Sequence, residues 1–252
     1  MAVEPIPGEP AAVADLDGER ALVVADYHAG IEVELRSEGV ELPSNARERR
    51  ERLLSLVDRT VADRLVVVGD LGHAIGKSGR LERDELFELF DALPGDLPVT
   101  VVKGNHDGDI ERVLESVDQD VAVAGGSGTR LGPVGFAHGH TWPGPDVIAA
   151  DVVCTGHEHP VVRLEDEVGG RRTEPAWLRG AVTAAPLDEY HGDPAVDIDG
   201  ELVVFPAFND RSGGTWVNVP GRSFLSPFLP EGLDGGQAYL LDGTRLGDYR
   251  RV

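Results

Sequence analysis

The sequence predicts a layered α/β fold that forms one domain over residues 1–252. Three observations support this prediction. Apolar runs of strand length alternate with stretches of helical periodicity, which is the pattern of a layered α/β protein. The chain opens with two strand-length runs joined by a tight-turn sequence. A length of 252 residues lies within the range of one large α/β domain and suffices to bury a full core.

The expected elements follow one another along the chain. Two strands, Ala11–Asp15 and Ala21–Ala25, flank Asp17-Gly18, a dipeptide whose positive φ angles suit a hairpin turn. Ser44 can cap a helix with apolar residues at helical spacing, and Pro94-Gly95 ends a second helix. The elements expected after the hairpin are a helix from Ser44 to about Ala62, a strand at Arg64–Val68, a helix from Glu82 to Leu93, and strands at Val99–Val102, Val134–Ala137 and Asp151–Cys154.

A polar cluster closes each of five apolar runs. The clusters are Asp26-Tyr27-His28, Gly69-Asp70, Gly104-Asn105-His106-Asp107, His138-Gly139-His140 and Gly156-His157-Glu158-His159. Because ligands in α/β sheets converge outside the carboxyl ends of strands, we expect the clusters to meet at one edge. Carboxylate, amide and imidazole groups without a thiolate form a ligand set suited to Mn, Fe or Zn ions. The pattern therefore predicts a metal centre.

The charge of the chain does not decide its partners. Its 45 acidic and 23 basic residues give a formal net charge of -22, which ordinarily argues against binding a polyanion. Only two lysines are present, Lys77 and Lys103, and acidic residues spread over the whole chain, as expected of a protein from an extreme halophile. In molar salt the screening length is only about 3 Å. The net charge therefore does not exclude a nucleic-acid substrate.

Cysteine content and hydropathy limit the possible cellular locations of the protein. Cys154 is the only cysteine, so no intramolecular disulfide can form, and its apolar neighbours predict a buried thiol in a strand. No stretch approaches the roughly 18 apolar residues of a membrane span, and the N-terminal residues lack the pattern of a signal peptide. We therefore expect a soluble, cytoplasmic protein with no membrane partner.

The order of the five clusters resembles that of the calcineurin-like metallophosphoesterase superfamily. Further segments resemble a narrower branch, the ICC-like, SbcD-related phosphoesterases of archaea and the ligase-associated DNA-damage-response endonucleases of bacteria. These segments are Pro160, Pro175–Leu178, Phe205–Asn209, Ser212–Gly214 and Phe224–Pro227. The resemblance implies a four-layer α/β/β/α sandwich with a dinuclear metal site at one edge of its two sheets.

The resemblance also implies ligands for two divalent metal ions, with Mn as the expected metal and Fe, Zn or Ni as alternatives. Asp26, His28 and His159 would hold the first ion, Asn105, His138 and His157 the second, and Asp70 would bridge both. The spacing of His157 and His159 fits this assignment, because alternate residues of an extended segment share one side, and Glu158 should point away to solvent or to a neighbouring group. His106 would face the substrate as a catalytic residue, with Asp107 orienting its ring.

Such a centre implies a hydrolase of phosphodiester bonds, in which a metal-bound hydroxide attacks phosphorus in line while both ions neutralise phosphoryl charge. The narrower resemblance favours single-stranded DNA or another nucleic acid as substrate, with DNA-repair helicases or ligases as partners. Two alternatives stay open. One is a small-molecule or cyclic-nucleotide phosphodiesterase or phosphatase, and the other is a non-catalytic metal-bound scaffold. The oligomeric state is also left open.

Several further residues are expected to have roles outside the ligand set. His73, Asn209 and Arg211 are predicted to bind substrate. His140 is predicted to orient a ligand loop, and His191, in a segment rich in Gly, Pro and Asp, to be exposed. Four arginines of the first predicted helix are expected to form a solvated face with Glu48 and Glu51. They are Arg47, Arg49, Arg50 and Arg52.

Overall fold

The computed structural model describes residues 2–40, 42–166, 168–192 and 198–252, which form two β-sheets. The strands of the first sheet are β1 (Val3–Pro5), β2 (Ala11–Asp15), β3 (Arg20–Val24), β4 (Arg64–Val68), β5 (Val99–Val102) and β6 (Val121–Ala124). They lie in the order β1-β2-β3-β4-β5-β6. β1, β2 and β3 pair antiparallel, and β3 to β6 run parallel.

The second sheet has eight strands. They are β7 (Thr129–Leu131), β8 (Val134–Ala137), β9 (Val152–Thr155), β10 (Val161–Glu165), β11 (Arg171–Val182), β12 (Glu201–Val204), β13 (Leu233–Leu240) and β14 (Arg245–Asp248). Seven follow the order β14-β13-β11-β12-β9-β8-β7, and β10 pairs with β11 as a hairpin. The neighbours β12, β9 and β8 run parallel, as do the central strands of the first sheet.

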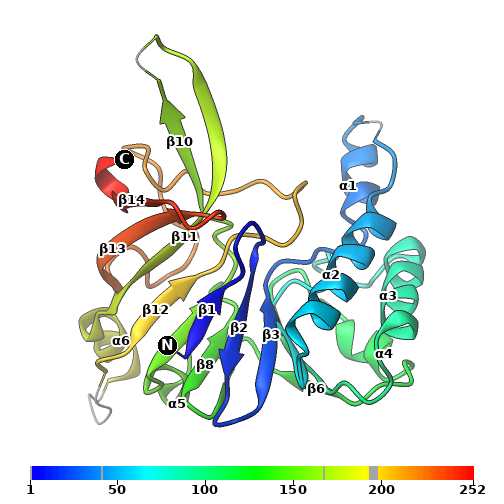
Figure 1. The fold of residues 1–252 in the computed structure, drawn as a ribbon. Coiled ribbons are helices and arrows are strands. Elements are labelled where there is room, and N and C mark those ends of the chain that lie inside the picture. The colour runs from blue at the N-terminus through cyan, green and yellow to red at the C-terminus, as the bar shows by residue number, and fades with distance from the viewer. Residues whose placement is uncertain (1, 41, 167, 193–197) are drawn as a thin grey trace.

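Helices lie on the outer faces of both sheets (Figure 1). On the first sheet they are α1 (Ile31–Ser37), α2 (Ala46–Thr60), α3 (Arg80–Ala92) and α4 (Ile110–Leu114), and on the second α5 (Pro145–Ile148) and α6 (Ala184–His191), with a 3-10 turn, η1, at Tyr249–Arg251. The order of layers is helix, sheet, sheet, helix. This is the four-layer α/β/β/α sandwich that the sequence motifs implied.

Alternation along the strands separates the apolar cores. In β4, Leu65 and Val67 pack with residues of α2 and α3, whereas Val66 and Val68 pack in the core between the two sheets. Successive side chains of a strand point to opposite faces, so a strand covered on both faces is apolar throughout. Cys154 of β9 lies in the core between the sheets, which confirms the predicted buried strand thiol.

The two helices predicted from periodicity are present with shifted ends. α2 begins at Ala46 after the N-cap residue Asn45, one position later than the predicted cap at Ser44. Ser44 still contributes, because its hydroxyl accepts a hydrogen bond from the Ala46 N–H at 3.3 Å. α3 begins at Arg80, two residues before the expected start.

The arginines of α2 do not form the solvated face expected from the sequence. Arg47 is exposed and pairs with Glu51, as predicted. Arg49 is buried, and its guanidinium binds the buried carboxylates of Glu32 in α1, at 3.3 Å, and Glu85 in α3. The other two pairs are Arg50–Glu88 and Arg52–Glu9. The correction for Arg49 follows from tertiary packing, because α2 lies between other elements and only one side of it faces water.

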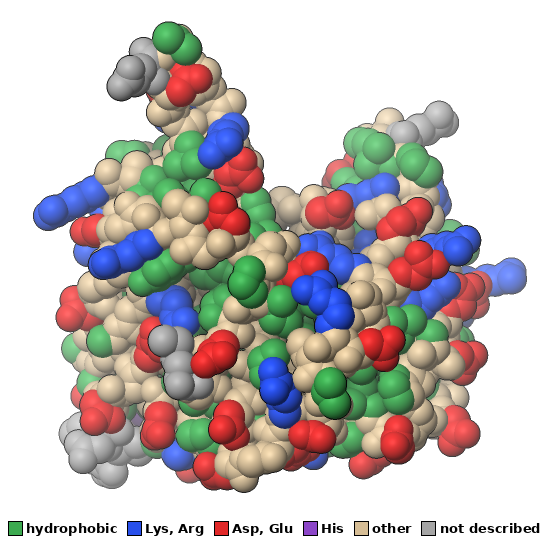
Figure 2. Space-filling model, in the orientation of Figure 1, with side chains coloured by type: hydrophobic (Ala, Val, Ile, Leu, Met, Phe, Trp, Pro, Cys, Tyr) green, Lys and Arg blue, Asp and Glu red, His purple; other side chains and the backbone are tan. Residues whose placement is uncertain are grey.

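Two parts of the chain project from the same side of the molecule (Figures 1 and 2). One is the β10–β11 hairpin, and the other contains α1. A recess separates them in the space-filling view, where acidic and basic side chains are mixed over the visible face. Within the described ranges, no helix has the length and apolar character needed to cross a membrane.

Candidate metal centre

The carboxyl ends of parallel strands bring all the predicted ligands together. In the first sheet the relevant strands are β3, β4 and β5, and in the second they are β8 and β9. The residues that follow these five strands are, in the same order, Asp26 and His28, then Asp70, then Asn105, then His138, and finally His157 and His159. The expected meeting of the five clusters at one edge is therefore observed.

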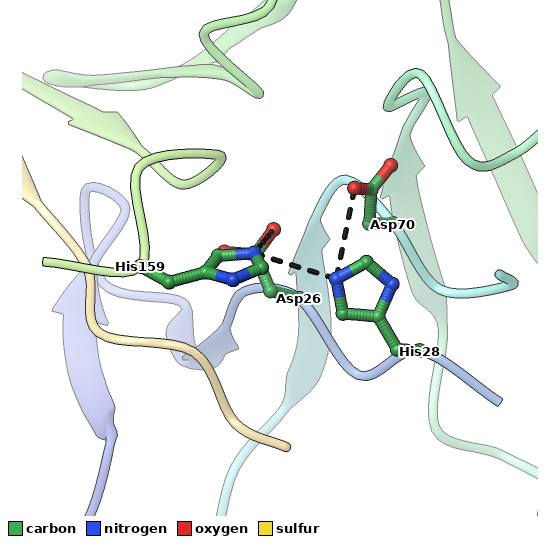
Figure 3. A group of neighbouring side chains, drawn as sticks. All are labelled: Asp26, His28, Asp70 and His159. Carbon is green, nitrogen blue, oxygen red and sulfur yellow. Dashed lines mark hydrogen bonds and ion pairs between the residues drawn. The ribbon is translucent and has the colours of Figure 1, made fainter. Parts of the chain in front are cut away.

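A first group of ligand atoms comes from Asp26, His28, Asp70 and His159, which all lie within 4.8 Å of one another (Figure 3). The Nε2 atom of His159 lies 3.0 Å from Oδ1 of Asp26 and 3.3 Å from Nε2 of His28. The same nitrogen of His28 lies 3.8 Å from Oδ2 of Asp70. Two imidazoles and two carboxylates thus surround one point, as in a cation site.

A second group of ligand atoms comes from Asp70, His138 and His157, again within 4.8 Å of one another. Nε2 of His138 lies 3.3 Å from Oδ2 of Asp70 and 3.2 Å from Oδ1 of Asn105. Asn105 therefore adjoins this group with a neutral oxygen. Asp70 is common to both groups, and the division of the other ligands between them matches the one implied by the resemblance.

Backbone carbonyls fix the orientation of two of these rings. Nδ1 of His159 donates to the carbonyl oxygen of Gly213 at 2.7 Å, and Nδ1 of His138 donates to that of Val68 at 3.0 Å. A carbonyl can only accept, so both rings carry the proton on Nδ1. Nε2 is then the nitrogen that a metal would bind after losing any proton it carries, which is how outer contacts usually orient histidine ligands.

The backbone at these positions is strained. Seven described residues other than glycine have a positive φ, and five of them are predicted ligands: Asp26 (59°), His28 (50°), Asp70 (49°), His157 (68°) and His159 (43°). The left-handed region costs an L residue about 1–2 kcal/mol. Such strain persists where the surrounding structure enforces a side-chain direction, and it concentrates at functional sites. Gly69, with φ 82°, lets the chain turn before Asp70.

The electrostatics of the cluster fit a bound cation. Asp26 and Asp70 are 0% and 1% exposed, and within the described ranges their ion-pair partners are histidines only. Burial opposes ionisation of these carboxyls, but the adjacent histidines keep the pKa of both below the usual range. Burial lowers the pKa of His28 to about 3 and that of His157 to about 4, which keeps both rings neutral. Burial also opposes the charged form of His138 and His159, but Asp70 and Asp26 outweigh it and raise the pKa of His138 to about 9 and that of His159 above its usual value. Buried carboxylates beside imidazoles suit divalent metal ions.

His106 lines a pocket of about 420 Å³ that includes residues of both ligand groups. Its Nδ1 donates to the carbonyl oxygen of His73 at 2.7 Å, which leaves Nε2 for a substrate. The expectation that Asp107 orients this ring is wrong. The buried carboxylate of Asp107 instead accepts hydrogen bonds from the N–H groups of Gly72 and Gly104, both at 2.8 Å, and thereby holds two ligand loops together.

His73 connects α1 to the first ligand group. Its Nδ1 lies 3.1 Å from Nδ1 of His28, and its Nε2 lies 2.7 Å from the carboxylate of Glu34. Its ring also stacks on that of His106, with centroids 4.9 Å apart. His73 lines the same pocket, so a contact with substrate stays a prediction.

The predicted substrate contacts of Asn209 and Arg211 stay predictions, and in the structure both side chains make contacts within the protein. Nδ2 of the buried Asn209 donates to the carbonyl oxygen of Tyr27 at 3.0 Å, and its Oδ1 accepts from the Arg211 N–H. The guanidinium of Arg211 binds the carboxylate of Glu32 at 3.1 Å and the carbonyl oxygen of Pro43. Asn209 thus fastens its segment to the loop that carries the first two ligands, and Arg211 fastens it to α1 and to the residue Pro43 before α2.

Glu158 points away from the metal ligands, as predicted. Its carboxylate contacts neighbouring protein groups, which is one of the two surroundings expected for it, and not solvent. Its side chain is fully buried. Oε1 accepts hydrogen bonds from the N–H groups of Leu225 and Ser226, at 2.8 and 2.6 Å, and Oε2 accepts one from the Thr215 hydroxyl at 2.8 Å. Glu158 therefore ties the segment from 215 to 226 to a ligand loop, a support that the sequence did not reveal.

The last two histidines differ in their surroundings. The ring of His140 lies 5.3 Å from that of the ligand candidate His138, so its proposed orienting role stays a prediction. His191 is half-buried and not exposed as expected. Its Nε2 donates to the carbonyl oxygen of Pro143 at 2.9 Å, which fastens the end of α6 to the loop before α5.

Comparison with solved structures shows a shared fold. The crystal structure of nuclease MPE from Pseudomonas putida matches with a TM-score of 0.56 and 21% sequence identity, covering 95% of this chain and 97% of that chain. Yfce, a phosphoesterase from E. coli, matches with a TM-score of 0.37 and 16% identity, covering 90% of this chain and 96% of that one. No protein-family model and no curated protein matches the sequence. The likeness to the nuclease shows that the two chains share one mixed α/β fold.

Proposed function

We propose that the protein is a hydrolase of phosphodiester bonds that depends on two divalent metal ions, with Mn as the expected metal. The observation that carries this proposal is the position of Asp70, which belongs to both groups of ligand atoms. A carboxylate shared by two adjacent sets of oxygen and nitrogen ligands is what a two-metal phosphoesterase requires. The fold likeness to a nuclease supports the proposal.

The chain would hold each ion with residues from both sheets. Asp26, His28 and His159 belong to one site, Asn105, His138 and His157 to the other, and Asp70 to both. The two metal ions, when bound, would neutralise charge on the phosphoryl group and lower the pKa of a bound water. The protein contributes preorganisation, because the strained ligand backbone and the carbonyl-bound rings keep the ligands in place before substrate binds.

His106 is the residue that we assign to the substrate. With Nδ1 bound to the His73 carbonyl, Nε2 is the ring atom left to interact with a phosphoryl oxygen or to protonate the leaving oxygen. Stacking on the His73 ring limits how far the imidazole can rotate.

Single-stranded nucleic acid is the substrate that we propose. The residues that line the pocket include Ile31 of α1 and Thr215. The Thr215 carbonyl accepts a hydrogen bond from the N–H of Val161, the first residue of β10, so Thr215 adjoins the base of the hairpin. The lining of the pocket thus includes a residue of α1 and a residue bonded to the first residue of the hairpin, an arrangement suited to an extended substrate.

The test is hydrolysis of bis-(p-nitrophenyl) phosphate and of labelled single-stranded DNA, side by side, in molar KCl with Mn, before and after treatment with a chelator. We expect both to be cleaved and the chelator to abolish both activities. Cleavage of the small diester alone would favour a small-molecule phosphodiesterase. The absence of metal-dependent cleavage of either would contradict the proposal and favour a metal-bound scaffold.

A further inference from the structure

A tryptophan beside the metal pocket holds two arginine side chains. The guanidinium carbon of Arg222 lies 5.3 Å from the centroid of the Trp216 ring, and that of Arg163 lies 6.0 Å from it. Both distances are within the range of a cation–π interaction. Among the described residues, no carboxylate forms an ion pair with either arginine, whereas many arginines of this acidic chain are paired, including Arg47, Arg50 and Arg52.

The manner in which these two arginines are held affects what they can bind. A guanidinium paired with a carboxylate is neutralised, and its donors are in use. An indole ring orients a guanidinium by its π-face and leaves the in-plane N–H donors free for an anion. In a chain with a net charge of -22, two cations kept in place without an acidic partner form a local site for a negatively charged ligand.

Trp216 is fixed relative to the metal ligands through its neighbour Thr215. The Thr215 hydroxyl donates to Glu158, which stands between two ligand histidines, and its N–H donates to the Glu158 carbonyl at 2.9 Å. The same segment pairs with the hairpin, since Val161 and Trp216 form a parallel bridge and Asn218 exchanges hydrogen bonds with the backbone of Arg163. Trp216 and the two arginines that contact it, Arg163 and Arg222, therefore lie at the base of the hairpin, next to the metal pocket.

We propose that Arg163 and Arg222, held on Trp216, bind a backbone phosphate of single-stranded nucleic acid that lies beyond the phosphate at the metal centre. This inference rests on the proposed function, because the occupant is the same polynucleotide that is cleaved there. Planar guanidinium groups match phosphate oxygens in pairs of hydrogen bonds. A small diester offers a single phosphate, which the metal centre takes, so the arginines act on chain substrates only.

The test compares the double variant Arg163→Gln/Arg222→Gln with the wild type on bis-(p-nitrophenyl) phosphate and on a labelled oligothymidylate. We expect the ratio of the two kcat/KM values, DNA over small diester, to fall about tenfold per arginine. The slope of log kcat/KM for DNA against log KCl concentration should become shallower by about 0.7 for each lost phosphate contact. The double variant Arg163→Lys/Arg222→Lys should recover most of the slope, because both charges remain.

Two further variants separate positioning from charge. Trp216→Leu keeps both arginines but removes the surface that orients them, so it should also lower the ratio. Arg20→Gln is the matched control, because Arg20 is exposed and lies at the start of β3, the end of that strand away from the ligands. It removes one charge and should leave the ratio and the slope at wild-type values.

The outcomes distinguish this inference from the proposed function. If the double glutamine variant has the same kcat/KM ratio and the same salt slope as Arg20→Gln, the proposed phosphate site is rejected, even if hydrolysis of the small diester is intact. A wild-type protein that cleaves neither substrate would overturn the proposed function. In that case fluorescence anisotropy of the oligothymidylate with chelator-treated protein still decides the inference, because equal affinities of wild type and double variant would reject it.

Discussion

Gly104 packs directly against the carboxylate of Asp70. A Cβ atom built on Gly104 would overlap Oδ1 and the backbone nitrogen of Asp70, and the same Oδ1 accepts a hydrogen bond from the His106 N–H at 2.8 Å. The φ of Gly104 is not positive, so close approach alone requires glycine here. The third polar cluster thus positions the shared ligand of both groups, besides supplying Asn105.

Gly104→Ala should weaken metal binding at both sites, because the new methyl group must displace the Asp70 carboxylate. Altered support of a metal ligand typically costs 10–100-fold, and we expect about that loss of Mn affinity by calorimetric titration. Gly95→Ala is the control, since a Cβ at Gly95 would meet no atom within 4 Å. Equal Mn affinities for the two variants would contradict the packing argument.

His106→Asn should abolish turnover while both metal sites remain. We expect kcat on the small diester to fall by about 10²–10⁴-fold, the usual contribution of a positioned acid or base. Mn stoichiometry, measured on the same preparation, should match that of the wild type. His191→Asn, which changes a histidine outside the pocket, should retain wild-type kcat. A His106→Asn protein with undiminished kcat would remove His106 from the mechanism.

Arg49→Met should destabilise the protein strongly, because it leaves Glu32 and Glu85 buried without their common cation. Removing one partner of a buried ion pair costs about 3–5 kcal/mol, and we expect a loss of that size in the free energy of unfolding of the metal-free protein in urea. Arg47→Met lies on the same helix and removes only an exposed pair with Glu51, so the free energy of unfolding should stay close to that of the wild type. Similar losses for both variants would disprove the buried network.

Cys154 should be inert in the folded protein. Burial raises the pKa of its thiol well above the usual range, so the thiolate, which is the reactive form, is scarce even at mildly alkaline pH. A thiol reagent should label Cys154 at the rate of unfolding and modify it fully in denaturant. Labelling of the native protein at the rate of a free cysteine would show that the core between the sheets is open.

The ligand positions were predictable because local sequence carries their signal. An apolar run such as Val66–Val68 is buried on both faces, and the polar residues that follow it mark the end of a parallel strand. Strands without such runs were not predicted. β14 is half-exposed at the sheet edge, and the first half of β11 is polar because it forms a projecting hairpin with β10.

Roles that depend on distant partners could not be predicted from local sequence. Asn209 donates a hydrogen bond to the carbonyl oxygen of Tyr27, which lies 182 residues earlier, so the local sequence does not reveal this contact. The acidic partners of Arg49 lie 17 and 36 residues away on other helices. Only tertiary packing reveals that these polar side chains are buried and form hydrogen bonds within the protein.

The central claim is that two ions bind with Asp70 between them, and Mn titration of the chelator-treated protein by calorimetry tests it most directly. We predict two ions per chain for the wild type, one for His157→Ala, and no tight binding for Asp70→Asn, with hydrolysis of the small diester lost in the last. A wild type that binds a single ion, or an Asp70→Asn variant that keeps two, would contradict the account.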